Sequence, residues 1–350
     1  MMPSLTCIQL DLDQASNLPA ELERRALGAI GVGVPGDEVL GAMPFQAVAM
    51  PLLEGQARAV VDIWLSAEAL RSGEQDGIRF RFDDHVLFAV LTLDERDFAE
   101  KDGVSALQQA TRHGYARLFR LLDQLGYPYL WRVWNYLADI NGEQDGLERY
   151  RQFNVGRQQA YEACDRAVQG FASAACALGA AKGPLTVAVM AGKAAPLLLE
   201  NPRQVRAYEY PLEYGPRSPI FSRAALVNLP GQEQLFISGT ASIVGHRTMH
   251  PGDVAAQTRE TLANIAAVLD EANRVAPGVP FTLPDLNYRA YVRHAADLPA
   301  VRTEIQQRVG TAQVQYVQAD VCRSDLLVEI EAMASRPAEM QSDSGSVRAA

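Results

Sequence analysis

Residues 221–237 read FSRAALVNLPGQEQLFI, and their two apolar runs, at 221–229 and 234–237, predict a pair of strands. Residues 253–272, DVAAQTRETLANIAAVLDEA, come next and carry apolar side chains at the spacing of an amphipathic helix. Strands are predicted next at residues 286–294, 313–321 and 326–332, and a short helix at residues 299–309. Antiparallel strands with helices laid on one face of the sheet fit this order. The stretch therefore predicts a unit of the α+β class.

The same order of elements occurs earlier in the chain. Strands are predicted at residues 78–82, 86–93, 129–137 and 185–190, and helices from residue 104 and over 147–178. Short segments match in order at an offset of 147 to 158 residues: VLF 86–88 with QLF 234–236, LLDQ 121–124 with VLDE 268–271, WRVW 131–134 with YRAY 288–291, and ADI 138–140 with ADL 296–298. An ordered series at nearly one spacing indicates an internal repeat. Residues 77–212 and 213–336 are therefore predicted to be two copies of one unit.

The two ends of the chain lack the full pattern. Residues 1–76 predict a degenerate N-terminal domain of short strands, with a hairpin between the apolar runs at 45–53 and 57–65. Residues 337–350 contain the run SDSGS and predict a flexible tail. A chain of 350 residues is expected to form two or three domains, and the repeat divides it into an N-terminal, a central and a C-terminal domain.

The composition excludes several classes of function. Thirty-two Lys and Arg against 42 Asp and Glu give a formal net charge of −10, so a broad surface for binding nucleic acid is not expected. The four cysteines, Cys7, Cys164, Cys176 and Cys322, form no C-x-x-C pair, and the five histidines form no ligand motif, so neither disulfides nor a metal site are expected. No secretory signal and no membrane-spanning apolar run is found, which predicts a cytoplasmic protein.

The C-terminal copy resembles the RidA family of small proteins related to imine deaminases. The resemblance is carried by residues 215–218 (GPRS), 236–239 (FISG), 253–258 (DVAAQT), 262–265 (LANI) and 328–332 (VEIEA). RidA proteins assemble as trimers with active sites in the clefts between subunits. Val314 stands where that family carries the arginine that binds a carboxylate, so the resemblance does not extend to imine deamination.

The whole chain is similar to a larger family built on that fold, the chorismatases. The resemblance is carried by residues 131–136 (WRVWNY), 149–154 (RYRQFN) with Gly156-Arg157, Tyr210 and Tyr214 before 215–219 (GPRSP), Arg223, 238–242 (SGTAS), and Cys322-Arg323 seven residues before Glu329. Chorismatases are similar to a RidA trimer fused into one chain. The resemblance therefore implies a pseudo-threefold arrangement of mixed, mainly antiparallel sheets with helices on one face. It also implies an active site between the central and C-terminal units, chorismate as substrate, no cofactor, no metal and a monomer.

Cleavage of the enolpyruvyl ether of chorismate needs a general acid that protonates the enol methylene. Glu329 suits this role, because it lies in the apolar run LLVEI at residues 326–330, where burial would raise the carboxyl pKa. Glu329 and Glu331 share one face of the predicted strand, so alternation alone also allows both to face solvent. The resemblance favours Glu329 as the buried acid.

The two carboxylates of the substrate call for two cationic anchors, and the planar guanidinium of arginine suits a carboxylate. We expect Arg157 and Arg223 in this role, with Arg217 in reserve. Tyr150 precedes Arg157 by seven residues, so both lie on one face of a helix. Tyr150 and Tyr210 would supply hydroxyl groups and a ring wall.

The resemblance implies that Gly239 and Cys322 decide the product. Members with Gly and Cys at these places make 3-hydroxybenzoate, whereas hydrolytic members lack the cysteine and carry a bulkier residue near Gly239. The glycine would also let the substrate ring approach the backbone closely. Chorismate equals hydroxybenzoate plus pyruvate with no net water, so the ring hydroxyl can act as an internal nucleophile. Cys322 would then assist the opening of an arene-oxide-like intermediate.

The sequence thus predicts a cofactor-free lyase that cleaves chorismate to 3-hydroxybenzoate and pyruvate. Some relatives with the cysteine also release 4-hydroxybenzoate, so a mixed product is a second expectation. These acids would feed pigment or other aromatic secondary metabolism, and the 4-isomer ubiquinone biosynthesis. The alternatives are a hydrolase that forms a dihydroxycyclohexadiene carboxylate and a non-catalytic RidA-like protein that binds a metabolite.

Overall fold

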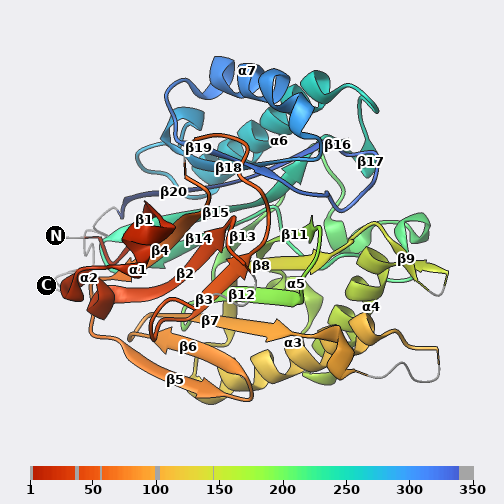
Figure 1. The fold of residues 1–350 in the computed structure, drawn as a ribbon. Coiled ribbons are helices and arrows are strands. Elements are labelled where there is room, and N and C mark those ends of the chain that lie inside the picture. The colour runs from red at the N-terminus through yellow and green to blue at the C-terminus, as the bar shows by residue number, and fades with distance from the viewer. Residues whose placement is uncertain (1–2, 36–38, 56, 99–102, 145, 339–350) are drawn as a thin grey trace, which may run out of the picture.

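The structure is a computed structural model, and it describes residues 3–35, 39–55, 57–98, 103–144 and 146–338. These residues form three main sheets with helices on their outer faces (Figure 1). Each sheet is mainly antiparallel and contains one parallel pair of strands, which confirms the predicted α+β class. The predicted flexible tail lies, from residue 339 onward, outside the described residues.

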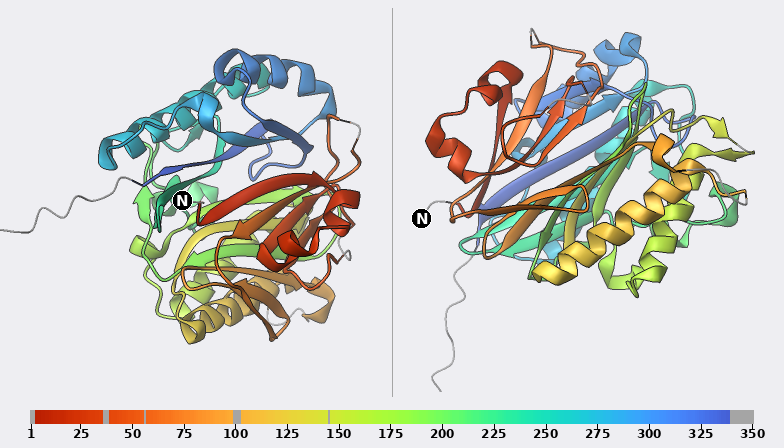
Figure 2. Two further views of the ribbon diagram at one scale, coloured as in Figure 1. Left: turned by 90° about the vertical axis from the view of Figure 1, so that its left-hand side faces the viewer. Right: turned by 60° about the horizontal axis from the view of Figure 1, so that its bottom comes forward.

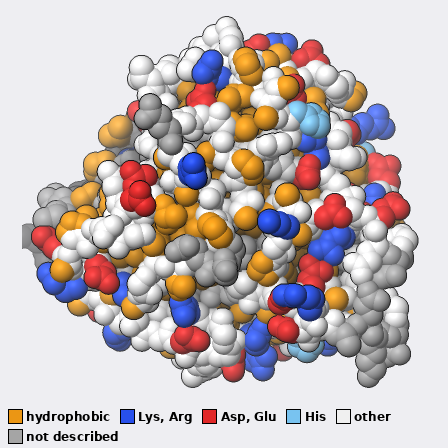
Figure 3. All heavy atoms as spheres, viewed as in Figure 1, with side chains coloured by type: hydrophobic (Ala, Val, Ile, Leu, Met, Phe, Trp, Pro, Cys, Tyr) orange, Lys and Arg blue, Asp and Glu red, His pale blue; other side chains and the backbone are white. Residues whose placement is uncertain are grey.

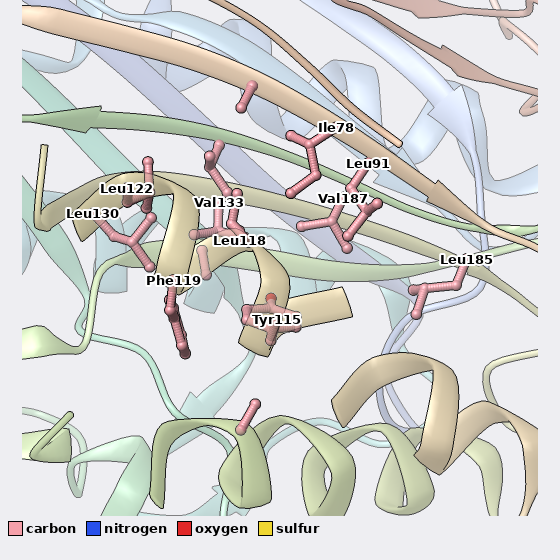
Figure 4. Close-up of a cluster of buried hydrophobic side chains, with 14 of the residues drawn as sticks. Ile78, Leu91, Tyr115, Leu118, Phe119, Leu122, Leu130, Val133, Leu185 and Val187 are labelled. Carbon is pink, nitrogen blue, oxygen red and sulfur yellow. The ribbon is translucent and has the colours of Figure 1, made fainter. Parts of the chain in front are cut away.

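The second sheet along the chain has the strand order β11-β8-β12-β7-β6-β5. Its strands are β5 (Arg71–Gln75), β6 (Ile78–Phe82), β7 (Val86–Leu93), β8 (Tyr129–Ala138), β11 (Ala174–Ala180) and β12 (Leu185–Gly192), and its helices are α3 (Ala106–Leu125) and α4 (Arg149–Ala163). Helix α3 begins after Ser105, whose side chain accepts the Gln108 N–H, and ends at Gly126 in the left-handed conformation, with φ 80°. Its leucines pack against the strands in one buried cluster (Figure 4).

The third sheet repeats this topology, with the order β13-β14-β15-β20-β18-β19. Its strands are β13 (Leu197–Leu199), β14 (Ala224–Leu229), β15 (Gln232–Ala241), β18 (Asn287–Val292), β19 (Val314–Gln318) and β20 (Val328–Pro337), and its helices are α6 (Val254–Val275) and α7 (Leu298–Val309). In the second sheet the last strand, β12, pairs with β7 and with β8, which lies between the two helices in the chain. In the third sheet β20 pairs in the same way with β15 and β18. The parallel pairs, β8 with β11 and β18 with β19, also correspond.

The first sheet has the order β1-β4-β2-β3, which matches the last four strands of the other two sheets. Its elements are β1 (Leu5–Asp11), α1 (Leu12–Ser16), α2 (Ala20–Arg25), β2 (Ala26–Val32), β3 (Phe45–Val48) and β4 (Val60–Ser66). The first sheet therefore has a reduced form of the same topology, without counterparts of the two leading strands of the other sheets.

The face of each sheet that the helices do not cover packs against a common core. This core contains buried aromatic side chains from every sheet, among them Trp64, Phe88, Trp131, Trp134 and Phe236. The helices cover separate outer cores, with α6 and α7 on the third sheet and α3 and α4 on the second. The first sheet lies beside the other two (Figure 2). Each sheet is thus buried on both faces, and the region between sheets is where cavities can form.

Shorter elements connect these layers. They are η1 (Glu95–Asp97), β9 (Glu143–Gln144), β10 (Leu147–Glu148), α5 (Val168–Phe171), η2 (Ala207–Glu209), η3 (Leu212–Tyr214), β16 (Ile243–Val244), β17 (Arg247–Thr248), η4 (Leu283–Asp285) and η5 (Ala295–Asp297). In the described part of the chain, no helix has the length and apolar character needed to cross a membrane.

Two local predictions were wrong. The helix predicted over 147–178 ends at Ala163, Asp165 takes a positive φ of 52°, and residues 174–180 form strand β11 instead. The segment AACALGA favours a helix by composition, but its small side chains are buried where β11 pairs with β8, so tertiary packing decides. The predicted hairpin is also absent, because β3 pairs with β2, and β4 lies between β1 and β2.

The division of the chain into three domains stays a prediction, and the strands cross its proposed boundaries. Strand β5 precedes residue 77 but pairs with β6 in the second sheet. Strand β13 precedes residue 213 but pairs with β14 in the third sheet. Gly77 and Gly215, near which the boundaries were predicted, mark turns and not the limits of the sheets. The segment before each boundary supplies an edge strand to the next sheet.

Candidate active site

A cavity lies between the second and third sheets, where α4 and β11 face β15 and β20. It consists of two adjoining hollows with about 600 and 320 Å³ of empty space, including the opening to solvent. Seven of the predicted site residues line it, namely Tyr150, Arg157, Tyr210, Arg223, Gly239, Cys322 and Glu329. The cavity therefore lies between the two repeated units, and its size suits a small molecule.

Glu329 lies on β20 with 4% of its surface exposed. Within the described residues, no hydrogen bond or ion pair to its carboxyl group is formed. Burial, together with the charge of Glu331, raises the carboxyl pKa to about 8, although the charge of Arg132 opposes the shift. The carboxyl group therefore keeps its proton near neutral pH. The solvent-facing position that alternation allowed for Glu329 and Glu331 does not occur, because both are buried.

Gly239 lies in a β-bulge of β15, where the pairing with β20 shifts between Ile237 and Thr240. A Cβ atom at this position would overlap a carboxyl oxygen of Glu329 and would lie 2.8 Å from its Cδ and 3.2 Å from the Cβ of Cys176. Only a residue without a side chain leaves the Glu329 carboxyl in this position. Gly239 therefore makes room for the carboxyl itself, which the sequence did not show.

Three guanidinium groups line the cavity with N–H groups that have no acceptor. These are Nε of Arg157, Nε of Arg223 and Nη2 of Arg323, all buried. Neither Arg157 nor Arg323 forms an ion pair with another described residue. Arg223 has the carboxylate of Glu200 at 4.0 Å, and burial raises the pKa of Glu200 to about 7 although the charge of Arg223 opposes the shift. The cavity therefore presents an excess of positive charge and unused donors, which suits an anion.

The three arginines are held in place by neutral acceptors and aromatic rings. Nη2 of Arg157 donates to the side chain of Asn154 at 2.9 Å. Nη2 of Arg223 donates to the Tyr210 hydroxyl at 3.0 Å and to the backbone of Val205 at 2.8 Å. The guanidinium of Arg323 lies 3.9 Å from the centre of the Tyr214 ring. These contacts position the guanidinium groups without neutralising their charges, and of the three only Arg223 has a described carboxylate, that of Glu200, within 4.0 Å.

Cys322 lies in the loop between β19 and β20, at the same cavity as Glu329. Burial raises the pKa of its thiol to about 12, and the charge of Glu329 adds to the shift. The thiol therefore stays protonated and can donate a hydrogen bond, but it is not available as a thiolate nucleophile at neutral pH. Tyr150 on α4 also keeps its proton, because burial raises the pKa of its hydroxyl.

One predicted site residue is placed elsewhere, and one is missing from the prediction. Arg217 is exposed, does not line the cavity and lies 3.7 Å from Glu162, and its role as a reserve anchor stays a prediction. Arg323 was missed, although it directly follows Cys322 and therefore enters the same loop.

The outer surface contrasts with the cavity. On the face shown in Figure 3, Lys and Arg side chains are interspersed with Asp and Glu side chains (Figure 3). Among the described residues, no group of three or more His, Cys, Asp and Glu side chains could hold a metal ion. The three arginines with unused donors thus mark the cavity as the place where an anion can bind.

Known proteins resemble the chain over most of its length. Residues 62–191 match the family model described as chorismatase FkbO/Hyg5-like, N-terminal. A 3-hydroxybenzoate synthase of Streptomyces hygroscopicus is 37% identical over 285 residues, which cover 79% of this chain and 81% of that protein. A chorismatase of Streptomyces rapamycinicus is 37% identical over 331 residues, which cover 92% and 93%.

A solved structure agrees with these relatives. The crystal structure of a chorismatase superposes with a TM-score of 0.83 and 34% identity, covering 94% of this chain and 98% of that one. This structure covers 94% of the chain, so the likeness extends over parts of all three sheets. The chain is an enzyme of the chorismatase family.

Proposed function

We propose that this enzyme cleaves chorismate to 3-hydroxybenzoate and pyruvate, with Glu329 as the general acid. The observation that carries the proposal is the combination, in one cavity, of a buried protonated carboxyl group and three guanidinium groups with unused donors. A dicarboxylate with an acid-labile enol ether requires both features. The name of one relative, a 3-hydroxybenzoate synthase, supports this choice of product.

Substrate binding is assigned to the arginines. Arg157 comes from α4 of the second unit, whereas Arg223 and Arg323 come from the third unit, so they approach the cavity from both walls. Two of these guanidinium groups would bind the two carboxylates of chorismate through paired N–H donors. The third, Arg323, stacks on Tyr214 and Tyr210 and would form part of the wall against the substrate.

The first chemical step is the transfer of the Glu329 proton to the methylene carbon of the enolpyruvyl group. This forms an oxocarbenium-like centre and leaves Glu329 as a carboxylate. The hydroxyl oxygen of the ring then attacks the neighbouring ring carbon, and the ether bond at that carbon breaks. Pyruvate leaves with the ether oxygen, the hydroxyl proton returns to Glu329, and an arene-oxide-like ring remains. All atoms of chorismate are retained in the two products.

The second step opens the arene oxide. Cleavage of the carbon–oxygen bond at the original hydroxyl position leaves the oxygen on the meta carbon, and loss of the ring proton there gives 3-hydroxybenzoate. Cleavage of the other bond gives 4-hydroxybenzoate. The Cys322 thiol, which burial keeps protonated, would donate a hydrogen bond to the oxygen as the ring opens. This single chain supplies both walls of the cavity, and we therefore propose that the monomer is active.

The test is incubation of the purified chain with chorismate, followed by chromatographic separation of the acids and enzymatic measurement of pyruvate. We expect equal amounts of pyruvate and hydroxybenzoate, with the 3-isomer in excess. In water labelled with heavy oxygen, the phenolic oxygen should stay unlabelled, because the nucleophile is the substrate's own hydroxyl. A dihydroxycyclohexadiene carboxylate without aromatic product would instead establish a hydrolase, and no consumption of chorismate would favour a metabolite-binding protein.

A further inference from the structure

A second cavity lies where the inner faces of all three sheets meet. It contains about 690 Å³ of empty space, including its mouth. Strands β1, β2 and β4 of the first sheet, β8 of the second, and β15, β18, β19 and β20 of the third supply its walls. It shares no lining residue with the candidate active site among the described residues. The proposed reaction therefore makes no use of it.

The charged groups of the second cavity neutralise one another. Arg132 forms an ion pair with Glu331, and Arg289 forms ion pairs with Asp62 and, at 3.3 Å, with Glu331. Two guanidinium groups thus face two carboxylates. An entering anion would meet Asp62 and Glu331 without a free cation, and an entering cation would meet two guanidinium groups. The cavity therefore disfavours a charged ligand of either sign.

One polar group in the wall is left without a partner. Gln315 on β19 is 8% exposed, and its Oε1 accepts a hydrogen bond from Nε of Arg289. Because a guanidinium can only donate, this contact fixes the orientation of the amide. The Nε2 of Gln315 is buried and has no acceptor among the described residues. A buried N–H group of this kind is unfavourable until an acceptor reaches it.

Part of the remaining wall is aromatic, and the rest includes the apolar side chains of Ile30, Ala332 and Met333. Trp64, Trp134 and Phe236 line the cavity and are almost fully buried. The rings of Trp64 and Phe236 lie 5.7 Å apart at their centres, and the guanidinium of Arg132 covers the Trp134 ring at 5.1 Å. Surfaces of this shape favour a planar ring over a branched aliphatic group.

The mouth of the cavity consists of uncharged amides. Gln9, Asn287 and Gln313 lie there, and Nε2 of Gln313 donates to the side chain of Gln9 at 2.8 Å. These groups can exchange hydrogen bonds with a neutral polar substituent as readily as with water. The entrance thus matches the charge-balanced interior.

We propose that the second cavity is a binding site for a neutral, planar aromatic molecule that carries a hydrogen-bond acceptor, such as a carbonyl oxygen. The ring lies against Trp64, Trp134 and Phe236, and the acceptor receives the Gln315 amide proton. No covalent step is involved. The site is separate from the cavity that binds the dicarboxylate, and it selects an uncharged ligand instead of an anion.

Benzamide and benzoate are the matched probes, because they share a ring and differ in charge. Trp64 and Trp134 are two of the three tryptophans of the chain, so tryptophan fluorescence reports on this cavity. We expect benzamide to change the fluorescence saturably, with a Kd of ~1 mM for a ligand of this size. Benzoate should bind at least roughly tenfold more weakly, because it meets two carboxylates.

Two variants locate the bound probe. Gln315→Glu keeps an acceptor for Arg289 but removes the free donor, and should weaken benzamide binding about tenfold. Arg323→Lys, in the candidate active site, is the matched control and should leave benzamide affinity unchanged. The proposal is overturned if no saturation occurs up to ~10 mM benzamide, if benzoate binds as tightly, or if only Arg323→Lys weakens binding. Should Gln315→Glu unfold, as judged by circular dichroism, the preference of the wild-type chain for benzamide over benzoate decides.

Discussion

The two cavities hold two glutamates of one strand in opposite electrostatic settings. Glu329 and Glu331 lie two residues apart on β20, and both are buried. The Glu329 carboxyl faces the candidate active site, where no described side chain pairs with it, and burial raises its pKa to about 8. The Glu331 carboxylate lies in the second cavity, between Arg132 and Arg289, and also accepts the Tyr291 hydroxyl at 3.1 Å.

The comparison shows that burial alone does not assign a role to a carboxyl group. A buried carboxyl with no cation beside it keeps its proton and can act as an acid. A buried carboxyl between two guanidinium groups has its charge compensated and holds the sheets together. The contrast between Glu329 and Glu331 can be tested by making the same substitution at corresponding residues of the two cavities.

The largest effect is expected from replacing each carboxyl group by an amide. Glu329→Gln should lower kcat for chorismate by about 10²- to 10⁴-fold, because the amide cannot deliver the proton. Its stability should stay close to that of the wild type, since no ion pair is lost. Glu331→Gln should instead reduce the free energy of unfolding by about 3–5 kcal/mol, because two buried guanidinium groups lose a partner. Pyruvate release and urea denaturation measure the two effects, and undiminished turnover by Glu329→Gln would refute its role.

A smaller loss is expected from adding one methyl group at the bulge. In Gly239→Ala the new Cβ would overlap the Glu329 carboxyl, which must then move. A displacement of about 1 Å at a reacting group can reduce the rate by about 10²-fold. The double variant with Glu329→Gln should lose no more activity than Glu329→Gln alone, because Gly239 acts through the acid. Additive losses in steady-state kinetics would show that the glycine has a separate role.

The pH dependence should follow the proton on Glu329. Activity should be highest below about pH 8 and fall as the pH rises through that value, because the acid is then ionised. The folded chain binds this proton more tightly than the unfolded chain, so this group's contribution to the free energy of unfolding should also fall as the pH rises from 4.5 to about 8. Removing the neighbouring charge in Glu331→Gln should move the activity limb to lower pH. A limb at unchanged pH in a folded variant would contradict this coupling.

The smallest change in rate is expected from the cysteines. Cys322 lines the candidate active site, as does Cys176, and Cys7 lines the second cavity. Cys322→Ser should keep kcat within about tenfold, because the first proton transfer does not involve it, but should change the ratio of 3-hydroxybenzoate, 4-hydroxybenzoate and dihydrodiol. Cys7→Ser should leave that ratio unchanged. Chromatography of the acids measures both, and an identical product ratio in the two variants would remove Cys322 from the mechanism.

The sequence predicted the elements whose pattern is local. Helices α3 and α6 were found because each shows apolar side chains at helical spacing. Strand β11 was missed because its alanines and glycines carry no periodic signal, and only pairing with β8 makes it a strand. The position of β4 between β1 and β2 was also missed, because the order of strands in a sheet cannot be read from neighbouring residues in the sequence.

The sites show the same division between local and distant signals. Glu329, Cys322 and Arg223 were identified through motifs, and the structure brings them to one cavity. The ion pair between Arg132 and Glu331 joins residues 199 positions apart, so no local pattern could reveal it. The second cavity, which depends on that pair, was therefore absent from the sequence prediction.

The contact between Gly239 and Glu329 also constrains how this enzyme can diverge. A side chain at position 239 is tolerated only after the carboxyl at position 329 has found another place, so the effect of one substitution depends on the other. Variants that change the product through this bulge must therefore acquire their substitutions in a particular order. A library that varies position 239 alone would sample mostly inactive proteins. One that varies it together with the residues packed around Glu329 would reach sequences that single steps cannot.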